Sequence, residues 1–183
     1  MSTTSRPPRL TLGHTTKAVR DLDAMVAFYT EVLGFEVTNR GTAGDDAELV
    51  FISQDPGAHH QIVFVTGLDV PDNQFVLADH LAFRAESVED LRAIRANLEA
   101  AGVDDIIPVT HGNAWSLYFT DPEGNGLECF VDTPWHVAQP FLEPMDLDAD
   151  DLEAATLAQV DGQPEFQPFD AWRSVFAARL EGA

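Results

Sequence analysis

The chain has 183 residues, of which 45% are hydrophobic and 22% charged, and its formal net charge is −21. This balance is typical of a globular domain, and no apolar run reaches the ~18 residues of a membrane-spanning helix. So acidic a surface repels phosphate groups, which argues against nucleic acid and anionic membranes as partners. Cys129 is the only cysteine, which excludes an internal disulfide. Because the N-terminal segment also has no apolar signal core, we expect a cytoplasmic protein.

Two stretches of the chain resemble each other: residues 12–37 and residues 78–105. Each opens with a histidine, His14 or His80, on what we expect to be a short strand. Each continues into an amphipathic helix that stops at a glycine, Gly34 or Gly102. Glycine readily takes the left-handed conformation that ends a helix. The chain therefore contains an internal repeat, which is the first clue to its architecture.

The helix of the first stretch is indicated by an apolar stripe at three- and four-residue spacing: Leu22, Met25, Val26, Tyr29 and Val32. In the second stretch, Ser87 and Asp90 resemble a capping box that starts the helix. Each helix is followed by three strand-like segments: 35–39, 47–53 and 60–67, then 106–112, 116–120 and 126–131. The turn-forming residues 121–126 predict a hairpin between the last two strands.

Each half therefore consists of a strand, a helix and three strands. We predict an α+β fold in which two βαβββ modules form a pseudo-twofold domain with a C-terminal helical extension. The predicted limits are 10–135 for the domain, 10–68 and 75–133 for its modules, and 134–183 for the C-terminal arm and helices. Helices are expected at 150–160 and 169–180. In the latter, Trp172, Phe176 and Leu180 form a stripe that packs on its own domain or serves a homo-oligomer interface.

Three residues are candidate metal ligands: His14, His80 and Glu128. The two histidines occupy equivalent places in the repeat, so pseudosymmetry would put them on matching strands. Glu128 interrupts an apolar strand, and a buried carboxylate is costly unless it is paired or bound to a metal. The other interpretation is an arginine partner or hydrogen bonds at strand ends. Two histidines and one carboxylate suit Fe(II), with Mn(II) as the alternative, and ligand type does not exclude Zn(II).

Several segments together resemble the vicinal-oxygen-chelate superfamily: the strand histidines, the helix at 21–35, the strand at 79–83 and YFTDPEGNGLE at 118–128. Within it, the chain is most similar to type I extradiol ring-cleaving dioxygenases in a small single-domain form. The resemblance covers roughly residues 10 to 135. It implies the paired-module fold and an Fe(II)-dependent reaction. A catechol-type aromatic diol and O2 would be the small-molecule partners, and a ring-opened semialdehyde the product.

The resemblance also implies residues beyond the ligands. An acid–base histidine beside the dioxygen site corresponds to His60, with His59 as the alternative, because strand alternation does not choose between them. His111 and Tyr118, which precede the glutamate strand, correspond to a histidine and a tyrosine of the dioxygenase site. Tyr118 would hydrogen-bond a catechol oxygen. As other interpretations, Tyr118 is a core aromatic bonded to backbone and His111 a turn residue.

Other branches of the superfamily give rival functions. Glyoxalase I resembles this fold but closes its first module with a glutamate, whereas residues 59–65 carry no acid. Fosfomycin thiol transferases need a cationic pocket, and metal-free binding proteins do not need the three ligands. The alternatives are therefore a Lewis-acid metal enzyme of glyoxalase, thiol transferase or epimerase type, or a non-catalytic binding protein. We interpret His136 as structural and Cys129 as a small buried hydrophobe, and expect Trp115 and Trp135 to contribute pocket walls.

Overall fold

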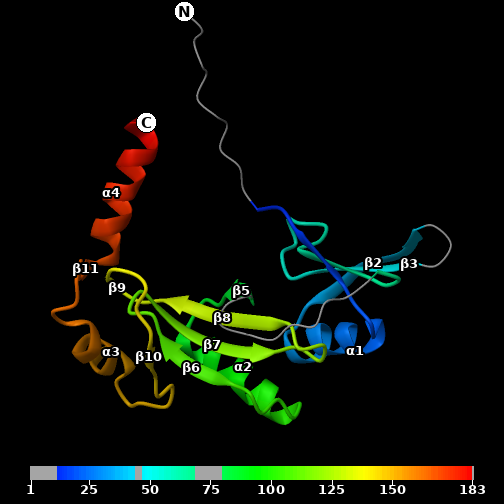
Figure 1. The fold of residues 1–183 in the computed structure, drawn as a ribbon, viewed down its shortest axis with the longest axis horizontal. Helices are drawn as coiled ribbons and strands as arrows, with labels where there is room; N and C mark the ends of the chain where they lie inside the picture. The colour runs from blue at the N-terminus through cyan, green and yellow to red at the C-terminus, as the bar shows by residue number, and fades with distance from the viewer. Residues whose placement is uncertain (1–11, 44–46, 69–79, 183) are drawn as a thin grey trace, which may run out of the picture. The chain divides into compact units, whose positions relative to one another are not determined.

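The computed structural model describes residues 12–43, 47–68 and 80–182 (Figure 1). The chain divides into two compact units, Met1–Pro71 and Asp72–Ala183. Each unit contains one strand–helix–three-strand module, and the first strand of each pairs in parallel with the fourth. The prediction of an α+β fold built from two βαβββ repeats is therefore confirmed. The predicted module limits at residues 10 and 75 lie outside the described residues.

The first unit holds a four-stranded sheet in the order β1-β4-β3-β2. Its strands are β1 (Thr15–Ala18), β2 (Glu36–Ala43), β3 (Ala47–Ser53) and β4 (Ile62–Val65). One face forms the core, where Val50, Ile52 and Phe64 are almost fully buried. The ring of Tyr29, from the helix of this unit, meets Phe64 edge to face with centroids 5.0 Å apart. The apolar stripe predicted for this helix therefore packs on the sheet.

The predicted helix at 22–32 consists of two segments, α1 (Leu22–Ala27) and the π-helix η1 (Phe28–Val32). In η1 the hydroxyl of Thr30 donates to the carbonyl of Val26 at 2.8 Å. The N–H of Leu33 then donates to the carbonyl of Phe28, five residues earlier, at 3.3 Å. A threonine that bonds back to the helix backbone competes with the regular ladder and favours such a widened turn. Hydrophobic periodicity does not reveal this change.

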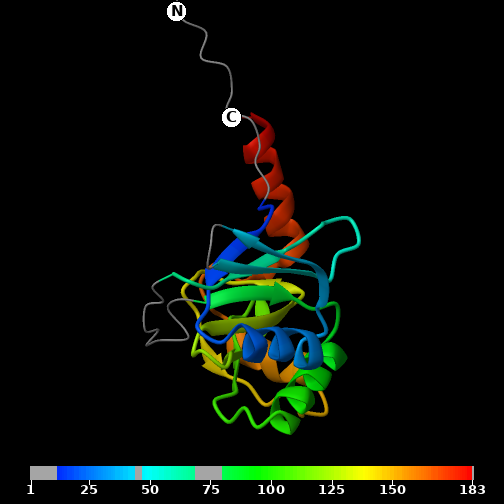
Figure 2. The same ribbon diagram turned by 90° about the vertical axis from the view of Figure 1, so that its right-hand side faces the viewer.

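The second unit holds a five-stranded sheet in the order β10-β6-β7-β8-β5. Its strands are β5 (His80–Arg84), β6 (Ile107–Thr110), β7 (Ala114–Thr120), β8 (Gly126–Asp132) and β10 (Glu143–Pro144). Helix α2 (Val88–Ala100) lies beside β7 and β8 (Figures 1 and 2). It begins with the predicted capping box, in which Ser87 and Asp90 bond to each other's backbone N–H. The predicted hairpin of β7 and β8 is also present.

The C-terminal segment folds onto this unit. Its elements are β9 (Trp135–His136), α3 (Leu152–Val160), β11 (Gln167–Pro168) and α4 (Phe169–Gly182), so both predicted helices are present. The indole N–H of Trp115 donates to the hydroxyl of Thr156 in α3 at 2.8 Å. Trp115 is only 4% exposed. Because side chains alternate along a strand, Trp115 and Tyr118 of β7 point to opposite faces of the sheet. The expectation that Trp115 forms a wall of the substrate pocket was therefore wrong, because α3 covers it.

Helix α4 projects from the rest of its unit in both ribbon views (Figures 1 and 2). At its base, Trp172 stacks on His136 with ring centroids 4.8 Å apart, and on Phe176 at 5.3 Å. His136 is buried, in agreement with its structural interpretation, while Phe176 is 45% exposed. The side chain of Leu180, the third member of the predicted stripe, lies outside the described residues. A homo-oligomer interface on α4 stays a prediction.

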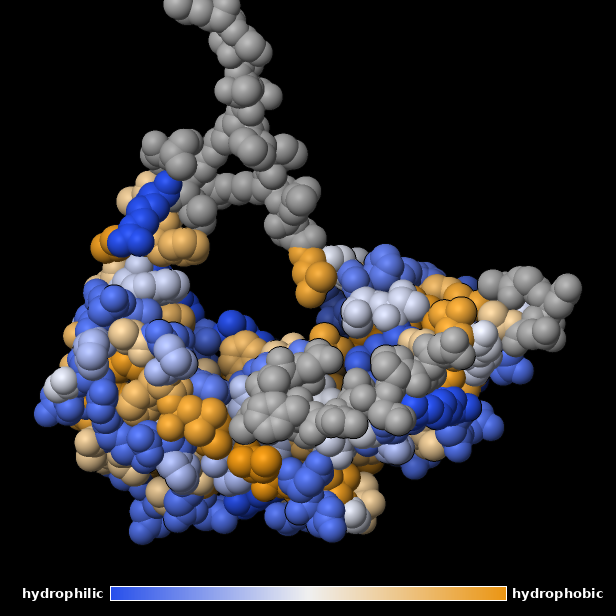
Figure 3. Space-filling model, viewed as in Figure 1, coloured by the Kyte–Doolittle hydropathy of each residue, from blue (hydrophilic) through white to orange (hydrophobic). Residues whose placement is uncertain are grey.

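On the face shown in Figure 3, hydrophilic side chains predominate among the described residues and apolar ones are scattered. Of the helices in the described ranges, none has both the length and the apolar character needed to cross a bilayer.

Gly112, in the turn between β6 and β7, supports a first prediction. Its φ is +74°, and a Cβ atom there would lie 2.5 Å from Cγ2 of Val137. We expect Gly112→Ala to lower the free energy of unfolding by about 2–4 kcal/mol, from left-handed strain plus steric overlap. Gly124→Ala is the matched control, because Gly124 has a φ of +77° and a Cβ atom added there would have no neighbour within 4 Å. This substitution should lower the free energy of unfolding by only about 1 kcal/mol. Urea denaturation of both variants measures the difference; equal losses would contradict the steric argument.

Candidate active site

One face of the second-unit sheet carries four of the predicted site residues. Tyr118 on β7 pairs directly with Glu128 on β8, and Ala82 on β5 pairs with Glu128 from the other side. Directly paired residues point to the same face, as do residues two apart on one strand. His80, two residues before Ala82, therefore shares this face. His111 follows the end of β6, and its side chain reaches the same group.

Glu128 is the buried charge of this face, with a side chain only 10% exposed. Its Oε2 lies 3.2 Å from Nε2 of His80, and its Oε1 lies 4.0 Å from Nε2 of His111. Among the described residues its ion-pair partners are these two imidazoles, and the arginine partner weighed from the sequence is not found there. Imidazole nitrogens around a buried carboxylate have the donor chemistry of a divalent-metal site.

His111 and Tyr118 form a hydrogen-bonded pair beside this carboxylate. The Nδ1 of His111 lies 2.9 Å from the carbonyl oxygen of Phe141, which can only accept, so Nδ1 carries the proton of the neutral ring. Nε2 of His111 can then accept from the hydroxyl of Tyr118, 2.9 Å away, whose single proton the carboxylate of Glu128 can also accept. Burial, followed by the charge of Glu128 and a hydrogen bond to it, raises the pKa of Tyr118 well above its usual value. The phenol is therefore protonated at neutral pH.

Two histidines come together in the first unit. His14 immediately precedes β1 rather than lying on it, because the ladder with β4 begins at Thr15. The rings of His14 and His60 have centroids 4.5 Å apart, and that of Phe51 lies 5.2 Å from His60. Desolvation, followed by the charges of His14 and His59, lowers the pKa of His60. His59 is exposed, with its Nδ1 2.9 Å from that of His60.

The strand registers show how the two modules differ. Phe51 pairs with Val63 on β3 and β4, as Tyr118 pairs with Glu128 on β7 and β8. The first module thus has apolar side chains where the second has a phenol and a carboxylate. Only the second module supplies an acid at this position. The pairing register reveals this equivalence, whereas the sequence alone shows only that residues 59–65 lack an acid.

The predicted site residues divide between the units: His14, His59 and His60 in the first, and His80, His111, Tyr118 and Glu128 in the second. Within each unit the structure brings its members together. In the described ranges, no group of three or more His, Cys, Asp or Glu side chains has the arrangement of a metal site. The complete ligand set of His14, His80 and Glu128 therefore stays a prediction.

Cys129 neighbours Glu128 on β8 but points to the other face of the sheet. It is 3% exposed, and burial, followed by the charge of Glu128, raises the pKa of its thiol to about 12. The thiol is therefore protonated at neutral pH, in agreement with its interpretation as a small buried hydrophobe.

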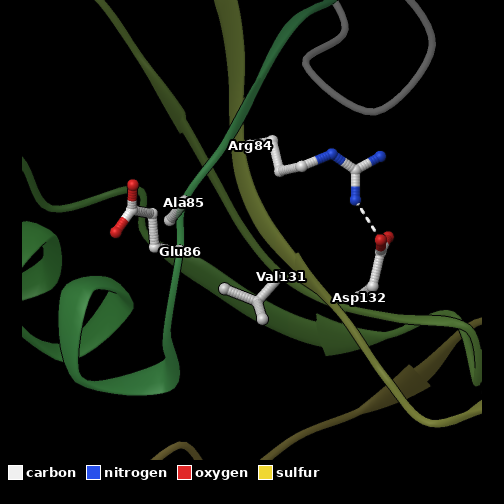
Figure 4. Close-up of a pocket in the computed structure, with 5 residues that line it drawn as sticks. All are labelled: Arg84, Ala85, Glu86, Val131 and Asp132. Carbon is white, nitrogen blue, oxygen red and sulfur yellow. Dashed lines mark ion pairs between the residues drawn. The ribbon is translucent and has the colours of Figure 1, made fainter.

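A pocket of about 410 Å³ lies where β5 and β8 end, lined by Arg84, Ala85, Glu86, Val131 and Asp132 (Figure 4). Figure 4 shows Arg84 reaching toward Asp132, with which it forms an ion pair, while Glu86 lies apart. The Arg84 guanidinium also covers the ring of Phe130, 4.5 Å from its centroid. None of the predicted site residues lines this pocket, and no sequence pattern indicated it. Because Arg84 and Asp132 pair with each other, their charges are not available to a ligand, and we propose no binding or catalytic role for this pocket.

Comparison with known proteins identifies the family to which this chain is similar. Residues 11–129 match the Glyoxalase/Bleomycin resistance protein/Dioxygenase superfamily. Biphenyl-2,3-diol 1,2-dioxygenase 3 of Rhodococcus globerulus is 31% identical over 124 residues, which are 66% of this chain and 63% of that protein. Catechol-2,3-dioxygenase of Bacillus subtilis (strain 168) is 26% identical over 132 residues, 67% of this chain and 42% of that protein. The chain thus spans less than two thirds of the length of these relatives.

Solved structures agree on the fold. A glyoxylase/bleomycin resistance protein/dioxygenase domain from Frankia sp. EAN1pec matches with a TM-score of 0.58 and 29% identity, covering 70% of this chain and 96% of that one. The fosfomycin resistance protein FosX of Listeria monocytogenes, complexed with Mn(II) and sulfate, matches with a TM-score of 0.53 over 67% of this chain and 93% of its own. At 22% identity, that likeness concerns the fold alone. Both the sequence match and the repeated modules lead to one conclusion: the chain belongs to the Glyoxalase/Bleomycin resistance protein/Dioxygenase superfamily.

Proposed function

We propose that this chain is a metal-dependent extradiol dioxygenase that opens the ring of a catechol-type diol with O2 to a semialdehyde product. The observation that carries the proposal is the buried carboxylate of Glu128, 3.2 Å from His80 and paired across strands with Tyr118. The dioxygenase names of relatives at 26–31% identity support the same reaction class.

The donor chemistry fits Fe(II), with Mn(II) as the alternative. Nε2 of His80 and the carboxylate of Glu128 would hold the ion from the second unit, and His14 would hold it from the first. When bound, such an ion lowers the pKa of diol hydroxyls and leaves coordination positions for the substrates. A cation at this place would also neutralise the buried charge of Glu128, which two neutral imidazoles do not.

Tyr118 and His111 would bind and orient the diol. With the proton of His111 on Nδ1, both Nε2 of His111 and the carboxylate of Glu128 are acceptors for the single proton of the Tyr118 hydroxyl. The lone pairs of the phenol oxygen then remain available to accept a hydrogen bond from a substrate hydroxyl. This arrangement would steer one diol oxygen beside Glu128 and favour its loss of a proton.

His60 would hold and return a proton beside His14. Its ring is half-buried and close to that of the proposed ligand His14, which supports this role. The apolar ring of Phe51 lies 5.2 Å from that of His60 and would limit access of water to this proton. We assign His60 the acid–base role and keep His59 as the alternative.

The first module offers no second acidic ligand, because Val63 occupies the place that Glu128 has in the second. This argues against a glyoxalase-type site with a carboxylate from each module. A Lewis-acid metal enzyme with two histidines and one glutamate is the alternative that the experiment must separate.

The test is anaerobic reconstitution with Fe(II), followed by catechol or 2,3-dihydroxybiphenyl in air. A yellow ring-opened product with matched oxygen uptake is expected, and it should be absent from Glu128→Ala. Asp132→Asn is the control: it removes an acid from the other end of the same strand and should keep both product formation and oxygen uptake. One bound metal per chain without oxygen uptake would reject the dioxygenase and favour Lewis-acid chemistry.

A further inference from the structure

A segment after the glutamate strand holds His111 in place through a closed set of hydrogen bonds. The side chain of Gln139 donates from Nε2 to the carbonyl of His111 at 2.8 Å. Its Oε1 accepts from the backbone N–H of Phe141 at 3.1 Å. The carbonyl of Phe141 in turn accepts from Nδ1 of His111 at 2.9 Å. One side chain thus joins the backbone of His111 to the peptide that fixes its ring.

The orientation of the Gln139 amide follows from its neighbours. Besides the His111 carbonyl, Nε2 faces two more acceptors: Oδ1 of Asn113 at 3.4 Å and the carbonyl of Val137 at 3.5 Å. The N–H of Phe141 faces Oε1. The reverse orientation would put oxygen against oxygen and an amide donor against a donor.

We propose that Gln139 is a positioning residue that fixes the tautomer and orientation of His111. With Nδ1 protonated toward Phe141, Nε2 of His111 presents its lone pair to Tyr118. Without the Gln139 side chain, the peptide of Phe141 loses its attachment to the His111 backbone, so its carbonyl is no longer held in place against Nδ1 of the ring. The consequence for catalysis rests on the proposed function; the consequence for the His111 ring does not.

The chain offers a matched control. Gln159 in α3 donates from Nε2 to the carbonyl of Pro144 at 3.1 Å. It thus ties the same segment by the same kind of bond, three residues beyond Phe141 and without contact to His111 among the described residues. Gln139 is exposed, so its replacement removes little buried surface. A general loosening of the segment should therefore follow from either variant, whereas a change at His111 should follow from Gln139→Ala alone.

The experiment is a long-range ¹H–¹⁵N spectrum of the histidine-labelled, metal-free chain of 183 residues at neutral pH, with the His111 signals assigned from a His111→Gln variant. The wild type and Gln159→Ala are expected to show His111 protonated on Nδ1. Gln139→Ala is expected to lose this single state and gain an Nε2-protonated population of at least about one half. Gln139→Glu, which keeps the acceptor for Phe141 but loses the donor to His111, should also shift, to a smaller extent.

Two results would overturn the proposal: a wild-type His111 ring protonated on Nε2, or a Gln139→Ala spectrum with the wild-type tautomer. Turnover of the Fe(II)-loaded proteins separates this proposal from the proposed function. We expect kcat with catechol to fall about 10-fold in Gln139→Ala and to stay within 2-fold in Gln159→Ala. A tautomer shift with unchanged kcat would support the positioning role and reject the catalytic role of His111. If the wild type had no dioxygenase activity, the proposed function would be rejected, and the His111 tautomer alone would decide whether Gln139 is a positioning residue.

Discussion

Glu128→Gln is expected to abolish stoichiometric Fe(II) binding and all dioxygenase turnover. The amide keeps the shape of the carboxylate but not its charge, so any loss is due to charge rather than to a cavity. Replacing residues that merely support metal ligands typically weakens binding by 10- to 100-fold. Loss of a direct ligand should weaken binding more than this, so we expect the affinity of Glu128→Gln for Fe(II) to be at least about 100-fold lower than that of the wild type.

The stability of the metal-free protein separates ligand loss from misfolding. In the wild type the Glu128 carboxylate is 10% exposed and has only His80 and His111 as ion-pair partners among the described residues. Replacing a buried carboxylate by a neutral amide of the same shape removes the desolvation cost of the charge, and the imidazole neighbours are not left as unpaired fixed charges. Metal-free Glu128→Gln should therefore melt at or above the wild-type temperature. The wild type should gain about 2.7 kcal/mol of stability at a metal concentration 100 times its Kd, and the variant should gain almost nothing.

Asp132→Asn is the matched control, because Asp132 lies on the same strand and face but pairs with Arg84 and Arg173. It should bind metal like the wild type and lose only a little stability, since its ion pairs are partly exposed. Metal content by elemental analysis and melting temperature with and without Fe(II) or Mn(II) provide the comparison. If Glu128→Gln retained one metal per chain with wild-type affinity, Glu128 would not be a ligand.

The sequence predicted the repeated architecture because its signals are local. The apolar stripe of α1, the capping box at Ser87 and the helix-ending glycines Gly34 and Gly102 each depend on a few neighbouring residues, and each is present. The widened turn of η1 was not predicted, because it depends on the hydroxyl of Thr30 rather than on the hydrophobic periodicity. Contacts from distant segments escaped as well, such as α3 covering Trp115.

The candidate site shows the same limit. His80 and Glu128 were selected by their places in strands and Tyr118 by the resemblance to a family, and the register brings the three to one face. The pairing of His111 with Tyr118 needed the resemblance to a family, since a histidine before a glycine also fits an ordinary turn. Gln139 was missed entirely. It acts on His111 from 28 residues away in the chain, and nothing in the local pattern of a polar, proline-rich segment distinguishes it from any other exposed glutamine.

His60→Ala is expected to keep the bound metal and lower kcat by about 100- to 10,000-fold, the range that a positioned acid–base group contributes. The structure supports His60 over its neighbour His59, between which strand alternation in the sequence does not choose. The His60 ring lies 4.5 Å from that of the proposed ligand His14 and 5.2 Å from Phe51. His59 is exposed, and among the described residues its ring contacts are with His60 and with Phe51, 5.9 Å between centroids, rather than with His14. His59→Ala should therefore stay within about 5-fold of wild-type turnover.

Two measurements on these variants make the assignment decisive: metal content and oxygen uptake under saturating catechol. A variant that loses both has disturbed the proposed ligand His14, whereas one that keeps its metal and loses oxygen uptake has lost a proton-transfer group. If His60→Ala turned over like the wild type while His59→Ala did not, the roles would be reversed and His59 would be the acid–base residue. If both were active, neither histidine would be the acid–base residue. In the second unit Tyr118 and His111 already form a hydrogen-bonded pair beside Glu128, and they would be the next residues to replace.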